Sequence, residues 1–304
     1  MAVGFIGLGI MGSRMAANLL SKIPAGGRSG HPLVVHNRTR SRADQLVAGG
    51  AVWADTPAEV GRQSTVLFTM LARPEAVLET ALGPDGFLGA LPAGALWVDC
   101  STVNPSFSRR MAAEANELGV RLVDAPVTGS KAAAQAGELV FMVGGDLGDV
   151  EKCRPYLDLM GKRTVHVGAQ GAGASLKIVF NLIVGQSMLA FSEAISLGRS
   201  LGLSRETLHD FLIGALPVAP LIAFKRPKIE SGNYDADFPL QLMWKDLHLA
   251  ALTAYEQGVP LPSANAAKEV YAAAARSGLS DEDFSVIYRF INSEDPGHGE
   301  VNVG

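Results

Sequence analysis

The sequence predicts an α/β protein in which a doubly wound parallel sheet, in residues 1–167, is followed by an all-α domain in residues 168–304. Short β-rich runs alternate with helical stretches in the first half of the chain. Several of these runs are apolar throughout, as is typical of parallel strands that are covered on both faces. Near Gly168 the strand-like runs stop, and the rest of the chain reads as helix. Together these observations predict two domains.

Six runs have the length and composition of strands. They are Val3–Gly7, Leu33–His36, Thr65–Met70, Leu96–Cys100, Arg121–Ala125 and Val140–Gly144. The second domain should open on one long helix over Ala174–Leu201, whose first turns are apolar on nearly all sides. A helix with this pattern is buried all round, so we expect it to form the spine of the second domain or a contact between subunits.

Three features predict where later helices begin and end. Ser204 is expected to cap the start of one helix. Gly258, followed by Pro260, should end another. Ser280 and Asp283 have the spacing of a capping box at the start of a third.

The composition excludes several classes of protein. Of 304 residues, 48% are hydrophobic and 18% charged, a balance that implies a sizeable core and argues against a disordered chain. Lys and Arg number 26 against 30 Asp and Glu, a net charge of −4, so the surface has no general attraction for nucleic acid or anionic membranes. The longest weakly polar stretch, 213–224, is short and contains two prolines, so we expect no membrane span.

Cysteine and histidine do not predict a disulfide framework or a metal centre. The chain has only two cysteines, Cys100 and Cys153, and its six histidines are scattered. No pair of them has ligand spacing, so no metal site is predicted. Without a disulfide framework or a basic leader, a reducing, cytoplasmic setting is expected.

A glycine-rich turn follows the first predicted strand and opens a helix. Its residues are Gly7, Leu8, Gly9, Ile10, Met11 and Gly12. In this G-x-G-x-x-G pattern the glycines permit a tight turn, the approach of a pyrophosphate, and close packing of helix on strand. The phosphates would bind to free N–H groups at the helix N-terminus. The context predicts a Rossmann-type dinucleotide-binding domain.

The residues after the second predicted strand favour NADP(H) over NAD. An NAD-binding protein usually carries Asp or Glu here to hold the ribose 2′-hydroxyl. This chain has Asn37, Arg38 and Thr39 instead, and Arg38 with Thr39 can bind a 2′-phosphate. A solvated basic loop is the alternative. The preceding segment, residues 24–30, is interpreted as an insertion that the surface tolerates.

Two polar side chains stand out on the long apolar helix. Lys177 and Asn181 are four residues apart, so they share one helix face. An amine and an amide in such surroundings need a polar destination, and an active site between domains would supply one. A lysine that extends to solvent is the alternative.

These motifs together resemble the β-hydroxyacid dehydrogenase family, which includes 3-hydroxyisobutyrate dehydrogenases and glyoxylate/succinic semialdehyde reductases. The resemblance covers nearly the whole chain. It rests on the opening Gly4–Gly12, on Asp99–Thr102, on Asp124–Lys131, on Gly171–Asn181 and on the pair Lys245 and Asp246. The loop has Thr-Gly-Ser at 128–130 in place of the common Ser-Gly-Gly. Its Gly-Ser-Lys sequence at 129–131 and the segments 238–240 and 283–285 look closest to the glyoxylate/succinic semialdehyde reductases.

The resemblance implies a role for each site residue. Lys177 would be the general acid in reduction, or the base in oxidation, and burial lowers the pKa of an amine toward working pH. Asn181 would orient that amine or hold the substrate oxygen. Thr128, Gly129 and Ser130 would bind a substrate carboxylate. Further expected cofactor contacts are Met70, Leu71, Thr102 and Lys245, and further expected substrate contacts are Ser101, Phe238 and Asp246.

The leading functional hypothesis is NADPH-dependent reduction of short aldehyde or keto acids, with a small carboxylate as the partner. The alternatives are oxidation of 3-hydroxyisobutyrate, usually with NAD, reduction of imines, and a catalytically silent scaffold. Imine reductases and the scaffold type usually lack a lysine at the position of Lys177, which disfavours both. The resemblance also implies a homodimer or homotetramer. Trp244 would either narrow the substrate pocket or pack in the core.

Overall fold

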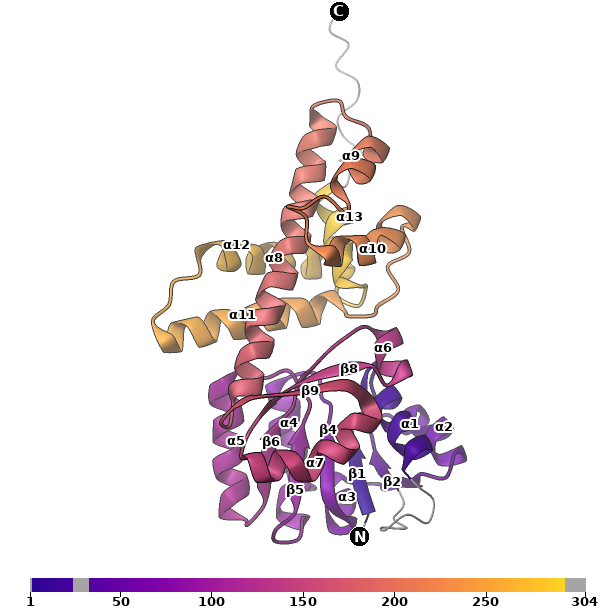
Figure 1. The fold of residues 1–304 in the computed structure, drawn as a ribbon, viewed down its shortest axis with the longest axis vertical. Coiled ribbons are helices and arrows are strands. Elements are labelled where there is room, and N and C mark those ends of the chain that lie inside the picture. Colours follow the sequence, from indigo (N-terminus) through magenta and orange to yellow (C-terminus); the bar gives the residue numbers. More distant parts are fainter. Residues whose placement is uncertain (1, 24–32, 293–304) are drawn as a thin grey trace, which may run out of the picture. The chain divides into compact units, whose positions relative to one another are not determined.

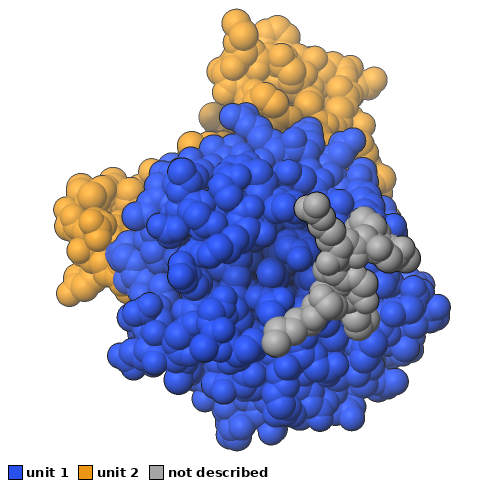
Figure 2. Space-filling view, turned by 60° about the horizontal axis from the view of Figure 1, so that its bottom comes forward, with its two compact units in different colours: residues 1–179 blue, residues 180–304 orange. Residues whose placement is uncertain are grey.

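The computed structural model describes residues 2–23 and 33–292, and the insertion predicted at 24–30 lies outside them. The chain forms two compact units, Met1–Val179 and Phe180–Gly304 (Figure 2). The units divide inside a helix, whereas the sequence pattern changes at residue 168. Each unit is described here by itself.

Unit 1 is built on one nine-stranded sheet (Figure 1). The strands are β1 (Ala2–Ile6), β2 (Leu33–His36), β3 (Val52–Trp53), β4 (Ser64–Thr69), β5 (Leu96–Asp99), β6 (Arg121–Asp124), β7 (Val127–Thr128), β8 (Leu139–Gly144) and β9 (Gly161–Gly168). All six predicted strands are present, with ends shifted by a residue. The sequence reading missed β3 and β7, which have two residues each, and β9, whose residues are mostly exposed or half-buried.

The order of the strands is that of a Rossmann-type sheet. They lie side by side as β3-β2-β1-β4-β5-β6-β8-β7, and the pairs from β3 to β6 are all parallel. The order reverses between β1 and β4, and open α/β sheets bind their ligands at that switch point, outside the carboxyl ends of the strands. The glycine-rich turn that follows β1 therefore occupies the expected position.

The far side of the sheet departs from the predicted all-parallel arrangement. β8 pairs antiparallel with β6 and β7, while β9 pairs parallel with β8. From β6 the chain passes through Pro126 directly into β7, and the short α6 turns it back into β8. Because only ten residues separate β7 from β8, fewer than the roughly dozen that a parallel crossover needs, the returning strand β8 runs in the opposite direction.

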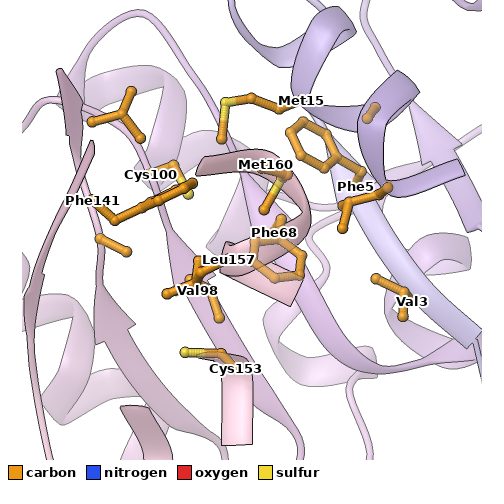
Figure 3. Close-up of a cluster of buried hydrophobic side chains, with 14 of the residues drawn as sticks. Val3, Phe5, Met15, Phe68, Val98, Cys100, Phe141, Cys153, Leu157 and Met160 are labelled. Atoms are coloured by element: carbon orange, nitrogen blue, oxygen red, sulfur yellow. The ribbon is translucent and has the colours of Figure 1, made fainter. Parts of the chain in front are cut away.

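Helices cover both faces of this sheet, so unit 1 is doubly wound as predicted. Its helices are α1 (Gly12–Lys22), α2 (Asp44–Ala48), α3 (Pro57–Gln63), α4 (Pro74–Leu82), α5 (Pro105–Glu117), α6 (Lys131–Ala136) and α7 (Leu147–Met160), with short turns η1 (Arg40–Ala43) and η2 (Leu88–Ala90). Alternate strand residues face opposite sides. On β5, Val98 packs in the cluster with α1 and α7, and Trp97 packs in the cluster with α3, α4 and α5 (Figure 3 shows the former).

Described residues of unit 2 are helical, with a core of their own. The elements are α8 (Ala172–Ser200), which begins in unit 1, α9 (Arg205–Leu212), α10 (Pro220–Ser231), α11 (Leu240–Gln257), α12 (Pro262–Ala274), η3 (Ala275–Leu279), η4 (Phe284–Val286) and α13 (Ile287–Asn292). Met188, Ile195, Ile222 and Tyr271 are at the centre of this core. The observed α8 closely matches the helix predicted over 174–201.

The prediction that α8 is buried on every side was wrong for the single chain. Val179 and Ile183 are 54% and 61% exposed, whereas Ile178 is buried. The prediction that no segment could span a membrane also needs correction. By length and composition alone α8 could span one, with a mean hydropathy of 1.6 over an 18-residue window. The sequence reading considered only unbroken apolar runs, whereas the apolar residues of α8 are interrupted by polar ones such as Lys177 and Asn181, which are costly inside a bilayer.

Two of the three predicted helix ends are confirmed. The Thr207 N–H donates to Ser204 Oγ at the start of α9 (3.0 Å), and Gly258 ends α11 with a left-handed φ of 66°. The capping box at Ser280 and Asp283 is not formed. Asp283 is buried and its side chain caps η4, while its N–H donates to the carbonyl oxygen of Tyr234. The requirement to pair a buried lysine, described below, overrides the local pattern.

Candidate active site

The glycine-rich turn has the geometry that a pyrophosphate requires. Gly7 has φ +98°, and a Cβ there would lie 2.4 Å from the Met70 carbonyl oxygen. A Cβ at Gly12 would lie 1.9 Å from the Gly7 carbonyl oxygen, so both positions require glycine. At Gly9, by contrast, a Cβ would meet nothing within 4 Å. Glycine at this position therefore keeps open a space that a side chain would fill, and a phosphate group fits there.

The start of α1 suits an anion as well. Its N-cap, Met11, makes no side-chain cap bond, and its first turn has no acidic residue. The unsatisfied N–H groups and the positive end of the helix dipole favour a bound phosphate. The residues present therefore fit a dinucleotide.

Asn37 ties the end of β2 to the glycine-rich turn. Its Oδ1 accepts from the Leu8 N–H (2.9 Å), and its Nδ2 donates to the Thr39 carbonyl oxygen (2.9 Å). Arg38 and Thr39, which follow directly, are exposed. The structure thus places the two candidate 2′-phosphate ligands next to a residue that contacts the turn. The neighbouring Arg40 lies over the Trp53 ring, 4.7 Å from its centroid.

A buried polar network fixes the loops that follow β4 and β5. Asp99 Oδ1 accepts from Thr69 Oγ1 (2.8 Å) and from the Ser101 N–H (3.1 Å). Ser101 Oγ in turn accepts from the Leu71 N–H (2.9 Å). Burial raises the pKa of Asp99 to about 6, against the hydrogen bonds from Ser101 and Thr69, which lower it. This network holds Leu71 and Ser101 beside the turn, because Leu71 also approaches Gly7.

The predicted carboxylate-binding residues lie at β7 and the start of α6. Thr128 is half-buried and pairs with Val140 of β8. Gly129 has φ +137°, and a Cβ there would lie 2.9 Å from the Leu139 side chain. Ser130 Oγ accepts from the Ala133 N–H (3.1 Å) and so caps α6. The Ser130 hydroxyl therefore has a structural task in addition to the predicted one.

Lys177 lies in the second turn of α8 and is 9% exposed. The helix start is held by Asp124, at the end of β6. Its Oδ1 accepts from the Gly171 N–H and its Oδ2 from the Ala174 N–H, both at 2.7 Å. Burial raises the pKa of Asp124, whereas these two backbone hydrogen bonds lower it. The carboxylate thus anchors the helix one turn before Lys177.

Asn181, Lys245 and Asp246 come together in unit 2. Asn181 Nδ2 donates to Asp246 Oδ2 (2.5 Å), and the Lys245 ammonium pairs with Asp246 Oδ1 (2.8 Å). Asn181 and Asp246 are buried. Gly185, one turn after Asn181, allows α11 to approach α8, because a Cβ there would lie 3.0 Å from Met243 Sδ.

Phe238 lies apart from that trio in the described contacts. Its ring packs edge-on against Phe284 at 5.8 Å, and its N–H donates to Asp283 Oδ2 (3.2 Å). Trp244 is 38% exposed, so it is not a core residue. Thr102, half-buried, follows directly after Ser101. No group of three or more potential metal-binding side chains occurs within 2–23 and 33–292.

Asp99 and Asp124 belong to the motifs that carry the family resemblance, but the sequence predicted no role for either. Each is a carboxylate at the end of an apolar strand, and the two are register partners on β5 and β6. An ionisable residue that ends a doubly covered strand needs polar partners in the fold, which was the available signal. The partners of Asp124, at the start of α8, are distant in sequence, and so is Thr69, which donates to Asp99 from the end of β4.

Comparisons with known proteins agree with this geometry. Residues 2–168 match the NAD binding domain of 6-phosphogluconate dehydrogenase, and residues 171–291 match the NAD-binding domain of NADP-dependent 3-hydroxyisobutyrate dehydrogenase. Glyoxylate/succinic semialdehyde reductases 2 (chloroplastic) and 1 of Arabidopsis thaliana are each 38% identical over 96% of this chain and over 80% and 98% of their own lengths.

A solved structure supports the same assignment. The 3-hydroxyisobutyrate dehydrogenase of Mycobacterium tuberculosis is 30% identical and superposes with a TM-score of 0.84, over 96% of this chain and 99% of that one. The fold, the glycine-rich turn and both domain matches point the same way. The chain therefore belongs to the β-hydroxyacid dehydrogenase family and is an NAD(P)-dependent hydroxyacid oxidoreductase.

Proposed function

We propose that this protein uses NADPH to reduce short aldehyde or keto acids, of the glyoxylate and succinic semialdehyde type, to hydroxy acids. The proposal is carried by two features that occur in the same chain. Lys177 on α8 is nine-tenths buried, and the residues that follow β2 include no carboxylate as far as Thr39. The lysine suits proton transfer to a carbonyl, and the β2 end suits the phosphorylated cofactor.

The chain's own residues supply the proton and the positioning. NADPH, when bound, supplies the hydride to the carbonyl carbon. Lys177 holds a proton on Nζ and donates it to the carbonyl oxygen as negative charge develops there. Asn181, whose amide nitrogen donates to Asp246, orients that amine through its carbonyl oxygen. Thr128, Gly129 and the start of α6 hold the substrate carboxylate.

The preference for NADPH rests on Arg38 and Thr39. The guanidinium of Arg38 makes charge-assisted hydrogen bonds to a 2′-phosphate, and the Thr39 hydroxyl adds another. Asn37, which accepts from the Leu8 N–H, is neutral and so does not repel the phosphate as a carboxylate at that position would. Arg38→Ala should therefore raise the KM for NADPH and leave the KM for NADH unchanged.

The proposal is tested by steady-state kinetics with each cofactor. Oxidation of NADPH is followed by absorbance with glyoxylate, succinic semialdehyde and methylmalonate semialdehyde, and oxidation of 3-hydroxyisobutyrate is followed with NAD. We expect the highest kcat/KM for an aldehyde acid with NADPH. Faster oxidation of 3-hydroxyisobutyrate with NAD would contradict both the direction and the cofactor preference.

Lys177→Ala should abolish turnover and spare NADPH binding. The variant lacks the proton donor, a loss of about 10²–10⁴-fold in kcat for general acid catalysis, while the glycine-rich turn is untouched. NADPH affinity is measured by fluorescence titration and kcat under saturating substrate. Lys162→Ala, at an exposed lysine of β9, is the matched control. Turnover within tenfold of the wild type would refute the role of Lys177.

A further inference from the structure

We propose that Asp124 is a positioning residue for Lys177, because its carboxylate fastens the first turn of α8 to the sheet and so sets the place of the lysine. The inference rests on the catalytic role proposed for Lys177. It adds a residue that contacts neither the substrate nor the cofactor and that acts through the helix backbone.

The contacts of Asp124 define the start of α8 at two points. One carboxylate oxygen accepts from the Gly171 N–H and the other from the Ala174 N–H, each at 2.7 Å. A single cap bond leaves a helix free to rotate about it, whereas two bonds from one rigid, planar group fix both its rotation and its rise. Lys177 follows Ala174 by three residues, so its Cα is placed almost directly by the second bond.

Close packing reinforces this arrangement from the helix side. A Cβ on Gly173 would lie 2.3 Å from the Met142 carbonyl oxygen and 2.8 Å from Asp124 Oδ2. A Cβ on Gly144 would lie 2.6 Å from Asp124 Oδ1 and 2.8 Å from the Gly173 nitrogen. Glycine at both positions lets β6, β8 and α8 meet around the carboxylate. The helix start therefore has no room to move toward the sheet.

Capping a helix with a buried carboxylate costs free energy, because the charged group loses its contact with water. Asp124 is 1% exposed, and its neighbour on β5 is another buried carboxylate, Asp99. Two charge-assisted bonds and the helix dipole offset the desolvation. The caps of α7 and α9, by contrast, are the exposed side chains of Asp146 and Ser204. Stability of α8 alone does not require burial, whereas a fixed attachment to the sheet does.

The test separates positioning from folding. Asp124→Asn keeps the size and shape of the side chain. Its one amide oxygen can accept a hydrogen bond from only one of the two backbone N–H groups, and its NH₂ group then faces the other donor. We expect kcat to fall by about 10- to 100-fold, the scale for an active-site group displaced by about 1 Å. The Kd for NADPH should stay within about twofold, because the glycine-rich turn lies elsewhere. Hydrogen exchange should quicken at the Gly171 and Ala174 amides and remain unchanged in the strands.

A second variant displaces the start of α8 while leaving the Asp124 carboxylate unchanged. Gly173→Ala forces the α8 start away from the Met142 carbonyl, so it should lower kcat with the same selectivity. Asp146→Asn, which weakens the cap of α7, is the matched control and should keep kcat within about twofold. Wild-type kcat in both test variants would overturn the proposal. A parallel loss of NADPH affinity and of strand protection would also overturn it, by showing a general structural role.

Failure of the proposed function has a different signature. In that case the wild type does not reduce aldehyde acids, or Lys177→Ala retains turnover. The kcat comparison is then made with whichever hydroxyacid reaction the wild type catalyses, and the hydrogen-exchange comparison needs no substrate. Unchanged exchange at Gly171 and Ala174 in Asp124→Asn refutes the anchoring itself, whatever the reaction.

Discussion

Single residues in this protein combine burial with charge where strands end. Asp99 is the clearest case, since its carboxyl group is buried beneath the loops expected to contact the cofactor and accepts hydrogen bonds from Thr69 and Ser101. Trp97 Nε1 also donates to Thr69 Oγ1 (2.8 Å), so an indole, a hydroxyl and a carboxyl form one chain. Such networks hold loops rigid because each member depends on the others.

The raised pKa of Asp99 predicts a pH-dependent stability. Its pKa of about 6, against the ordinary 3.8 of an aspartate in the unfolded chain, means that the folded state binds the proton more tightly than the unfolded state. The stabilisation is complete below pH 3.8 and is lost as pH rises through about 6. The free energy of unfolding of the wild type, minus that of Asp99→Asn, should fall by about 2 kcal/mol between pH 4 and pH 7.

Urea unfolding at a series of pH values measures this difference. Asp158→Asn, at an exposed carboxylate of α7, serves as the reference variant. A difference between wild type and Asp99→Asn that does not change with pH would show that Asp99 does not titrate in this range.

At the scale of elements, unit 2 is organised by a buried ion pair. The Lys225 ammonium on α10 contacts Asp283 at 2.9 Å, and their side chains are 4% and 0% exposed. Asp283 also accepts from the N–H groups of Asp237 and Phe238, so one carboxylate joins α10, η4 and the segment that leads into α11. That helix carries Lys245 and Asp246. The pair therefore determines where α11 begins.

Breaking this pair should destabilise unit 2 strongly. Lys225→Met or Asp283→Asn each leaves a buried group without its partner, a cost of about 3–5 kcal/mol. The double variant should cost less than the sum of the two, which a double-mutant cycle of urea unfolding measures. The exposed pair Arg289 and Glu282, 2.6 Å apart, provides a control cycle with a coupling of at most about 1 kcal/mol. Additive costs at Lys225 and Asp283 would be inconsistent with a coupled pair.

For the whole molecule, the exposed apolar side chains of unit 2 favour self-association. Leu201 at the α8 end is 72% exposed, Phe211 on α9 is 79% exposed, and Leu216 is fully exposed. We propose that these side chains contribute to a contact between copies of this chain, in the homodimer or homotetramer that the resemblance in sequence implies. Leu201→Lys with Phe211→Lys should shift the mass measured by light scattering toward that of one chain. Val52→Lys, on β3 of unit 1, is the control. An unchanged mass would place the interface elsewhere.

The sequence predicted most of the fold because its signals are local. Apolar runs located β1, β2, β4, β5, β6 and β8, and the glycines of the turn located the candidate cofactor site. The antiparallel β8 escaped prediction because strand direction depends on the connection, which a run of apolar residues does not encode. The exposed face of α8 was not predicted for a related reason. The apolar sequence of a helix does not show which other elements cover it.

For the candidate site, the sequence singled out side chains whose chemical type is unusual in its local surroundings. It did not single out side chains whose importance depends on contacts with distant parts of the chain. Lys177 and Asn181 stand out because they are polar on an apolar helix. Asp124 and Asp283 do not, because their partners lie far along the chain or are backbone amides of any residue type. The capping box predicted at Ser280 is absent for the same reason, because Asp283 pairs with Lys225, a residue that is distant in sequence.

The burial of Cys100 and Cys153 in one cluster has a practical consequence (Figure 3). Burial raises the pKa of both thiols, that of Cys153 to about 12, so neither is a thiolate at neutral pH. A thiol reagent can modify them only when the packing between the sheet and α7 opens. The rate of labelling therefore measures how often this part of unit 1 opens locally. A bound dinucleotide favours the closed form and should slow the labelling.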